Sequence, residues 1–148
     1  MTSPYLLRVE DLKTHFQLPR PHPLAPSRTL YAVDGVTFGV EKGKTFGLVG
    51  ESGCGKTTTA LTVLRLVEPT SGIIDFDGVD VARLNSKQMR QLRRRMQIIF
   101  QDPYSSLNPR STAGQIVAAP LKIQKLGDAR QRTERVAELL RLVGLRPE

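Results

Sequence analysis

The residues whose types and spacing indicate chemistry lie at positions 50–57, which read Gly-Glu-Ser-Gly-Cys-Gly-Lys-Thr. This segment matches the phosphate-binding pattern Gly-x-x-x-x-Gly-Lys-Ser/Thr at every fixed position. A triphosphate needs several hydrogen-bond donors at short range, and backbone N–H groups supply them only where the chain curls around the phosphates. Glycines at 50, 53 and 55 permit that curl and leave no side chain in the way. The pattern therefore predicts a phosphate-binding loop, or P-loop.

The polar residues at the end of the P-loop have predicted roles of their own. Lys56 is expected to reach the β- and γ-phosphates, and the Thr57 hydroxyl is expected to ligate Mg²⁺. A helix that starts near Gly55 would direct the positive end of its dipole at the same phosphates. The predicted ligands are therefore ATP, or a similar nucleotide, and Mg²⁺. The residues predicted to bind the nucleotide are Gly50, Glu51, Ser52, Gly53, Cys54, Gly55, Lys56, Thr57 and Thr58.

Two other glycine-rich motifs do not fit this segment. A hydrolase nucleophile elbow, Gly-x-Ser-x-Gly centred on Ser52, requires glycine at position 54, which is cysteine. The catalytic histidine of that fold follows the serine in the chain, whereas His15 and His22 precede Ser52. The dinucleotide-binding pattern Gly-x-Gly-x-x-Gly does not occur in the sequence. The P-loop is the interpretation that remains.

The P-loop is expected to lie between a buried strand and a helix. The apolar run at 45–49 predicts a short strand that is buried on both faces. Residues 57–67 predict a helix that ends before Pro69 and Gly72. The expected apolar side of this helix consists of Ala60, Leu61, Leu64 and Val67. A strand, a glycine-rich turn and a helix in this order form the context in which a P-loop match is meaningful.

The sequence on both sides of this unit predicts further strands. Alternating or continuous apolar residues predict strands at 5–12, 30–40 and 73–76. The segment 18–27 contains four prolines and predicts an extended surface loop between the first two strands. The dipeptide Asp77-Gly78 predicts a tight turn after the third strand.

The sequence after this turn predicts two helices and one more strand. A basic helix is expected at 86–94, with Ser86 as its N-cap. A second buried strand is expected at 96–100. Residues 133–143 predict an amphipathic helix, and Gly144 fits the position just after its end.

The composition limits the class of protein and of partner. The chain has 148 residues, the size of one domain, and no apolar run approaches the roughly 18–20 residues of a membrane span. We therefore expect a cytosolic chain without a membrane span. Its formal net charge of +8 is compatible with nucleic acid, an anionic membrane surface or polyphosphate as a partner. The single cysteine, Cys54, excludes an internal disulfide and a cysteine-based metal cluster.

Three segments of the sequence together resemble a known family. They are Val-Asp-Gly-Val-Thr-Phe at 33–38, Gly-Leu-Val followed by the P-loop at 47–57, and Ile-Ile-Phe-Gln-Asp-Pro-Tyr-Ser-Ser-Leu-Asn-Pro-Arg at 98–110. They are similar to the ATP-binding subunits of oligopeptide and dipeptide ABC importers, and the last segment is the most specific. The resemblance covers residues 6–145.

The resemblance implies a fold and a domain organisation. The fold is α/β, of the P-loop NTPase type: an ABC nucleotide-binding domain, incomplete, with an antiparallel β portion at its N-terminus. Residues 1–148 would be the N-terminal part of one such domain. Within it, residues 1–102 would form the core with the P-loop and the Q-loop, and residues 103–148 the start of the helical subdomain.

The resemblance also implies roles for residues outside the P-loop. Gln101 matches the Q-loop glutamine, which in the family contacts Mg²⁺ and the attacking water. Lys56 and Gln101 are then the implied catalytic residues, and Thr57 and Gln101 the implied metal ligands. Phe16 falls where the family has an aromatic residue that stacks on adenine, a role that needs only a flat π face. Tyr31 is the alternative, and Phe16 would otherwise be an ordinary hydrophobic residue at a strand end.

The sequence departs from the family pattern in its C-terminal part. It contains no Ser-Gly-Gly-Gln signature, no Walker B strand ending in Asp-Glu and no later switch histidine. Without the Walker B acid the attacking water has no general base, and without the signature no partner closes over the γ-phosphate. We therefore expect an N-terminal fragment or truncated gene product that is inactive as an ATPase on its own.

The leading functional hypothesis is ATP binding, with hydrolysis in the complete family member, that powers import of peptides or similar solutes through a membrane permease. The implied partners are transmembrane permease subunits and a second ATP-binding subunit in a head-to-tail dimer, with no nucleic acid. The implied location is cytoplasmic, peripheral on the inner face of the cell membrane. Two alternatives stay open: a nucleotide-binding module without turnover, and a nucleic-acid-dependent P-loop ATPase, which would use the charge of +8.

Overall fold

The structure is a computed structural model that describes residues 4–22, 26–102 and 107–147. The chain divides into two compact units, Met1–Gln97 and Ile98–Glu148, and each is described by itself. Two predicted features lie partly outside the described residues. They are residues 23–25 of the proline-rich segment and residues 103–106 of the segment that resembles peptide importers.

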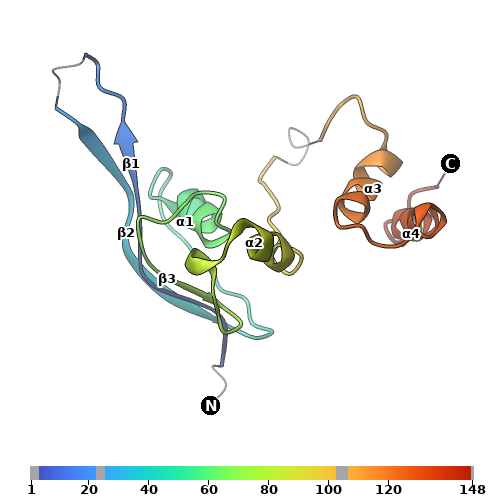
Figure 1. Cartoon of the computed structure of the whole chain (residues 1–148), viewed down its shortest axis with the longest axis horizontal. Coiled ribbons are helices and arrows are strands. Elements are labelled where there is room, and N and C mark those ends of the chain that lie inside the picture. Colours follow the sequence, from blue (N-terminus) through green and yellow to red (C-terminus); the bar gives the residue numbers. More distant parts are fainter. Residues whose placement is uncertain (1–3, 23–25, 103–106, 148) are drawn as a thin grey trace. The chain divides into compact units, whose positions relative to one another are not determined.

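The first unit is built on a four-stranded antiparallel sheet with the strand order β2-β1-β3-β4 (Figure 1). Its strands are β1 Tyr5–Leu18, β2 Arg28–Glu41, β3 Ser71–Phe76 and β4 Val79–Asp80. The three predicted strands are confirmed, and the first two run further than predicted, as a long hairpin. The turn at Asp77-Gly78 is also confirmed, because both residues have the positive φ, 51° and 82°, of a type I′ hairpin turn.

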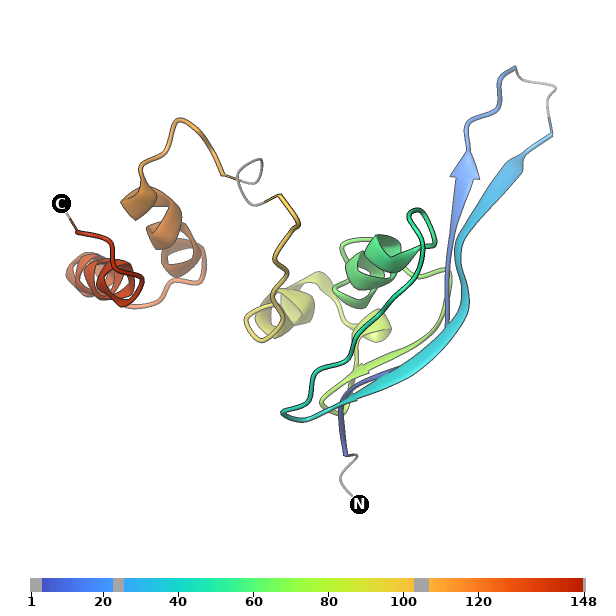
Figure 2. The same ribbon diagram turned by 180° about the vertical axis from the view of Figure 1, so that it is seen from behind.

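Helices cover one face of this sheet. They are α1 Lys56–Val63, the short 3₁₀ helix η1 Val81–Arg83 and α2 Ser86–Leu92. Helices α1 and α2 lie on the same side of the strands (Figures 1 and 2). Strand side chains alternate between the two faces, so every second one meets the helices. The apolar core between the layers consists of Val9, Leu12, Val33, Ile74 and Phe76 from the sheet with Val63, Val81, Met89 and Leu92 from the helices.

Helix α1 ends earlier than the predicted position 67. It stops at Val63, and Arg65 follows with a positive φ of 50°. The Arg65 N–H donates to the Thr62 carbonyl oxygen and the Leu66 N–H to that of Leu61, which are the two hydrogen bonds of a Schellman C-cap. This cap usually contains glycine at the position that Arg65 occupies, so the sequence did not signal where the helix ends.

The prediction of which side of α1 is buried is wrong. The prediction named Ala60, Leu61, Leu64 and Val67, whereas the buried residues of α1 are Thr59, Thr62 and Val63. Thr62 hydrogen-bonds with Thr14 of β1 across the interface, and this bond turns the threonine side of the helix toward the sheet. Hydroxyl groups can be buried at such an interface when they are paired.

The two short strands predicted at 45–49 and 96–100 are absent. Neither segment pairs with a strand of the described chain, and Val49 and Ile99 are 92% and 91% exposed. A strand buried on both faces needs neighbouring strands and a layer on either side. The strands that the structure describes all belong to the antiparallel sheet, and neither segment pairs with any of them. Phe46 does stack on Phe38, with the ring centroids 5.0 Å apart.

Helix α2 starts with a capping box, one residue earlier than the predicted N-cap. The N-cap is Asn85 and not the predicted Ser86. The Asn85 side chain accepts a hydrogen bond from the Gln88 N–H, and the Gln88 side chain accepts one from the Asn85 N–H. Both bonds are 2.9 Å long and satisfy N–H groups that would otherwise lack a partner.

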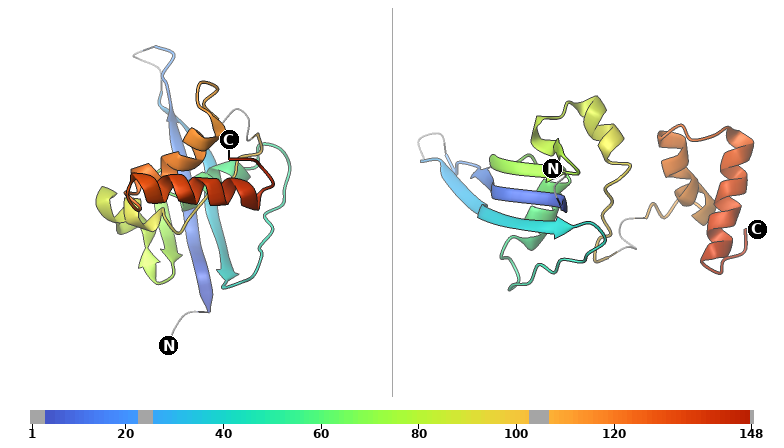
Figure 3. Two further views of the ribbon diagram at one scale, coloured as in Figure 1. Left: turned by 90° about the vertical axis from the view of Figure 1, so that its right-hand side faces the viewer. Right: turned by 90° about the horizontal axis from the view of Figure 1, so that it is seen from below.

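The second unit is a pair of helices packed against each other, α3 Ala113–Ile123 and α4 Ala129–Leu142 (Figure 3). Helix α3 was not predicted as a separate element. Helix α4 begins at Ala129 rather than at 133, because Asp128 caps it in a box with Gln131. Gly144 follows α4 with a φ of 77°, as predicted for a residue just past a helix end.

Candidate nucleotide-binding site

The predicted P-loop leads into the start of α1 and is exposed along most of its length. Gly55, the N-cap of α1, has a φ of 93°, a left-handed conformation that favours glycine. A Cβ atom on Gly55 would lie 2.4 Å from the Ala32 carbonyl oxygen of β2, which is too close for any side chain. Glycine is therefore required here both by the turn and by the close approach to the sheet.

The first turn of α1 is chemically suited to an anion. Gly55 has no side chain that accepts hydrogen bonds from the N–H groups of this turn, and the turn contains no acidic residue. Uncapped N–H groups at a helix N-terminus, together with the helix dipole, favour negative charge. Thr57 is exposed in this turn, whereas Thr59 is buried and donates to the Gly55 carbonyl oxygen at 3.0 Å.

Lys56 folds back over the P-loop and holds it curled. Its ammonium group donates to the carbonyl oxygens of Gly50 and Glu51, at 2.8 and 2.6 Å. A further contact, 3.5 Å from Nζ to Cys54 Sγ, is with a weak acceptor. An ammonium group has three N–H donors, so Lys56 shapes the loop with two of them, and the third, which meets only the weak acceptor Cys54 Sγ, can turn to a ligand.

The two aromatic residues considered for adenine lie on opposite faces of the β1–β2 hairpin. Thr14 points at α1, and Phe16 lies two residues further along β1, so Phe16 shares that face. Tyr31 pairs with His15 on the other face, with the ring centroids 4.5 Å apart and the rings edge to face. Phe16 is 38% exposed, which leaves part of the ring open to a ligand on the side where α1 lies.

Gln101, the predicted Q-loop glutamine, is exposed near the start of the second unit. Gln101 and Lys56 therefore belong to different units. Among the residues that the structure describes, no group of three or more His, Cys, Asp or Glu side chains could hold a metal ion. The predicted Mg²⁺ ligands Thr57 and Gln101 are of a different kind, a hydroxyl and an amide, which with phosphate oxygens suit a hard cation.

An ion cluster at Asp77 anchors the chain ahead of the P-loop. Lys42 Nζ lies 2.7 Å from one carboxylate oxygen of Asp77, and an Arg95 guanidinium nitrogen lies 2.5 Å from the other. The hydrogen bonds from Lys42 and Arg95 lower the pKa of Asp77 from 3.8 to about 2. Arg95 also lies over the ring of Phe76, 5.3 Å from its centroid. The cluster joins the turn after β2 to the β3–β4 hairpin and to the chain after α2.

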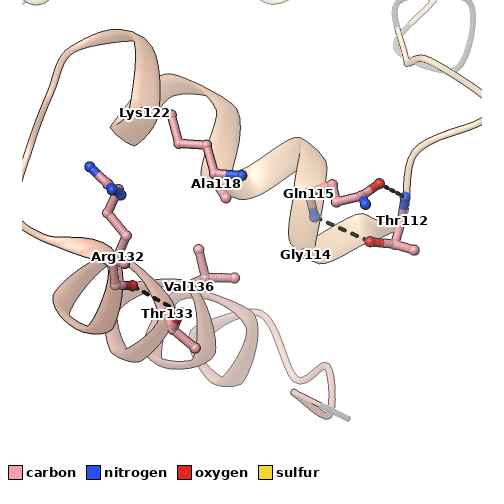
Figure 4. A pocket seen from close by; sticks show the side chains of 9 residues that line it. Thr112, Gly114, Gln115, Ala118, Lys122, Arg132, Thr133 and Val136 are labelled. Atoms are coloured by element: carbon pink, nitrogen blue, oxygen red, sulfur yellow. Dashed lines mark hydrogen bonds between the residues drawn. The ribbon is translucent and has the colours of Figure 1, made fainter.

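A groove that the sequence did not reveal lies in the second unit, between α3 and α4 (Figure 4). Its volume is about 470 Å³, and small and basic residues line it, including Gly114, Ala118, Lys122 and Arg132. Gly114 faces Val136 across the helix pair. None of the residues predicted to bind nucleotide lines this groove. Only the packing of two helices creates it, so no local sequence pattern could have predicted it.

The curled loop at 50–57 and the uncapped start of α1 have the features of a P-loop, although the strand expected ahead of it at 45–49 is absent. The ABC transporter family model matches residues 33–148, and the chain belongs to this family. The resemblance to ATP-binding subunits and the predicted fold class are thereby confirmed.

Curated relatives point to one branch of that family. The chain is 49% identical over 148 residues to a putative peptide import ATP-binding protein of Brucella ovis, an alignment that covers 100% of this chain and 44% of that protein. It is 48% identical over 145 residues to the oligopeptide transport ATP-binding protein OppF of Bacillus subtilis, covering 97% of this chain and 45% of that protein. The chain therefore spans less than half the length of the curated relatives it matches.

Solved structures agree on the fold. A dimeric structure of a post-hydrolysis state of the ATP-binding cassette MJ0796 bound to ADP and Pi matches with a TM-score of 0.73 at 23% identity, over 94% of this chain and 57% of that chain. The structure of cbiO1 from Clostridium perfringens matches with a TM-score of 0.68 at 23% identity, over 97% of this chain and 52% of that chain.

Within the described ranges, no helix has both the length and the apolar character of a transmembrane span.

Proposed function

We propose that the chain binds Mg-ATP, with the triphosphate in the P-loop at residues 50–58 and the adenine on Phe16. Lys56 contacts the β- and γ-phosphates, and the Thr57 hydroxyl ligates Mg²⁺, which offsets phosphate charge when bound. The observation that supports this most is the Lys56 ammonium group on the carbonyl oxygens of Gly50 and Glu51. These bonds hold the loop in a curled form and keep a positive charge against it.

The donors around the curled loop fit a polyphosphate better than another anion. Lys56 is the first residue of α1, so its ammonium group and the uncapped N–H groups of the helix belong to one short segment that supplies several donors. Hydrogen bonds between such donors and phosphate oxygens are charge-assisted, and they are about twice as strong as neutral ones. Exposure of residues 50–54 leaves the loop open to the ligand.

Strand geometry favours Phe16 over Tyr31 as the residue that stacks on adenine. Phe16 lies on the face of β1 that α1 covers further along, while Tyr31 lies on the opposite face against His15. A nucleotide whose phosphates lie at the start of α1 can extend toward Phe16 without crossing the sheet. Stacking on an aromatic face contributes about 0.5–1.5 kcal/mol beyond the buried area.

In a complete member of the family, ATP binding and hydrolysis would drive the import of peptides or similar solutes. Relatives of 49% and 48% identity are named as peptide import and oligopeptide transport ATP-binding proteins. Transmembrane permease subunits and a second ATP-binding subunit, arranged head to tail, would be the partners, at the inner face of the cell membrane. Gln101 would contact Mg²⁺ and the attacking water. The 148 residues include neither a Walker B acid nor the signature, so this chain alone would bind ATP without turnover.

Displacement of a fluorescent ATP analogue tests the binding assignment. In the presence of Mg²⁺, ATP and ADP should displace the analogue, and AMP should need at least a roughly tenfold higher concentration, because it makes none of the charge-assisted contacts of the β- and γ-phosphates. Equal displacement by AMP and ATP would show that the P-loop does not hold these phosphates.

The nucleic-acid alternative draws on a basic stretch that has no acidic residue between Asp80 and Asp102. Two of its arginines already have partners in the first unit: Arg93 donates to the Arg65 carbonyl oxygen, and Arg95 pairs with Asp77. We therefore propose no nucleic-acid partner. A titration of DNA at several salt concentrations checks this, since genuine phosphate contacts would give a steep loss of affinity with salt.

A further inference from the structure

Two buried threonines connect the strand that contains Phe16 to the helix that begins in the P-loop. Thr14 Oγ1 of β1 lies 3.0 Å from Thr62 Oγ1 of α1, and the two residues are 1% and 0% exposed. Thr62 Oγ1 also donates to the Thr58 carbonyl oxygen at 2.8 Å. A hydroxyl group has a single hydrogen to donate, so the bond between the two threonines is donated by Thr14.

These bonds form a chain that runs from β1 into the nucleotide-binding segment. Its order is the Thr14 hydroxyl, the Thr62 hydroxyl and the Thr58 carbonyl oxygen. Thr58 follows Thr57 in the first turn of α1. Phe16 lies two residues beyond Thr14 on the same face of β1. Two hydrogen bonds therefore join the strand of the adenine-stacking residue to the turn that would hold Mg²⁺ and phosphate.

We propose that the Thr14–Thr62 contact fixes the distance between the adenine half and the phosphate half of the site. This inference rests on the proposed function above. Both threonines are positioning residues, which do not touch the nucleotide. Apolar packing of Val63 also holds α1 against the sheet, but hydrophobic contacts are non-directional. A hydrogen bond has a preferred length and angle, so this one sets the position of α1 along β1.

A comparison of two ligands distinguishes a contact that positions the two halves of the site from one that only supports the P-loop. ATP contacts both halves of the site, whereas inorganic tripolyphosphate contacts the phosphate half alone. A displacement of one half relative to the other therefore weakens the binding of ATP and leaves the binding of tripolyphosphate unchanged. Damage to the P-loop weakens the binding of both ligands.

The test is a calorimetric titration of the full 148-residue chain with Mg-ATP and with Mg-tripolyphosphate. It compares the wild-type chain with Thr14→Val, Thr62→Val and the double variant, since valine keeps the shape of threonine and removes the hydroxyl. We expect each variant to bind ATP about fivefold more weakly, the scale of one neutral hydrogen bond. Tripolyphosphate should bind all of them as it binds the wild-type chain.

The double variant separates affinity from stability. Thr62→Val leaves the Thr14 hydroxyl buried without an acceptor, so this single variant should be the least stable of the three. Removing both hydroxyls takes away the unpaired group, so the double variant should regain stability while its affinity for ATP stays low. A contact that is merely structural predicts instead that the affinity returns together with the stability.

Two control variants calibrate the result. Thr37→Val removes a comparable hydrogen bond, 2.9 Å from the Asp11 N–H to Thr37 Oγ1, which ties β1 to β2 and not to α1. It should leave the binding of both ligands unchanged. Phe16→Ala should weaken ATP binding and spare tripolyphosphate, which marks the size of the adenine contribution.

The possible outcomes test the positioning role of the two threonines and the proposed function separately. The positioning role is overturned if the double variant binds ATP like the wild-type chain, or if both ligands lose affinity equally. Failure of the wild-type chain to bind tripolyphosphate, or an unchanged affinity for ATP in Phe16→Ala, would contradict the proposed function itself. The further inference and the proposed function can thus fail separately.

Discussion

Arg65, just past the end of α1, has a backbone conformation that arginine rarely adopts. Its replacement tests how much its backbone and side chain contribute to the stability of the first unit. The residue has a φ of 50°, at the C′ position just after the C-cap Leu64, where glycine is usual. Its guanidinium group donates to the carbonyl oxygens of Val81 and Leu84, which link α1 to η1. It also pairs with the carboxylate of Glu68 at 2.9 Å. These contacts stabilise the positive φ.

Alanine and glycine at position 65 separate the side-chain and backbone contributions. Both remove the bonds to Val81 and Leu84, and hydrogen bonds from a charged group are worth about 1.5–3 kcal/mol each. Because one nitrogen of Arg65 makes both bonds, we expect Arg65→Ala to lose about 2–3 kcal/mol of the free energy of unfolding. Glycine adopts a positive φ without strain, so Arg65→Gly should be about 1 kcal/mol more stable than Arg65→Ala. If position 65 lay inside a regular helix, Arg65→Ala would instead be more stable than Arg65→Gly.

Urea unfolding followed by circular dichroism measures these differences. Glu68→Ala is the matched control, because the Glu68 side chain is 71% exposed and its ion pair should contribute less than about 1 kcal/mol. If Arg65→Ala proved as stable as Arg65→Gly or more so, the left-handed cap and the early end of α1 would both be refuted. A loss in Glu68→Ala equal to that in Arg65→Ala would show that the bonds to η1 contribute nothing.

Three further predictions follow from other parts of the chain. The pKa of Asp77 is lowered from 3.8 to about 2, so its ion cluster should stabilise the fold above pH 3.8 and lose that effect as the pH falls toward 2. The free energy of unfolding, measured as a function of pH, should show this dependence in the wild-type chain and not in Asp77→Asn. A maleimide should label the exposed thiol of Cys54, and Mg-ATP should slow the labelling severalfold by covering the loop while AMP protects little; equal rates would place the phosphates elsewhere. The chain alone should release phosphate from ATP no faster than Lys56→Ala, and steady release that depends on Lys56 would contradict the expected lack of turnover.

Local sequence patterns predicted the parts of the structure that local chemistry determines. The strands of the β1–β2 hairpin and the turn at Asp77-Gly78 follow from apolar alternation and from residues that tolerate positive φ. The P-loop was recognised from one contiguous pattern, and the φ of 93° at Gly55 is a local reason for glycine at that position. Such features need no knowledge of distant contacts.

The errors arose where the outcome depends on residues far apart in the sequence. The apolar runs at 45–49 and 96–100 show that these segments favour burial, but whether they form strands depends on neighbours that the described sheet does not offer. The buried side of α1 depends on the partner that Thr62 finds in Thr14, 48 positions away. No periodicity within α1 contains that information.

Binding of Mg-ATP through Lys56 is the central claim, and calorimetry on a pair of lysine variants tests it most directly. Lys56→Ala removes the ammonium group that both curls the loop and offers a donor to the phosphates, so we predict a loss of affinity of about tenfold or more. Lys44→Ala removes the same charge from an exposed position just ahead of the loop and should bind Mg-ATP like the wild-type chain. Equal affinity of Lys56→Ala and the wild-type chain, or no binding of Mg-ATP to the wild-type chain at all, would contradict the account.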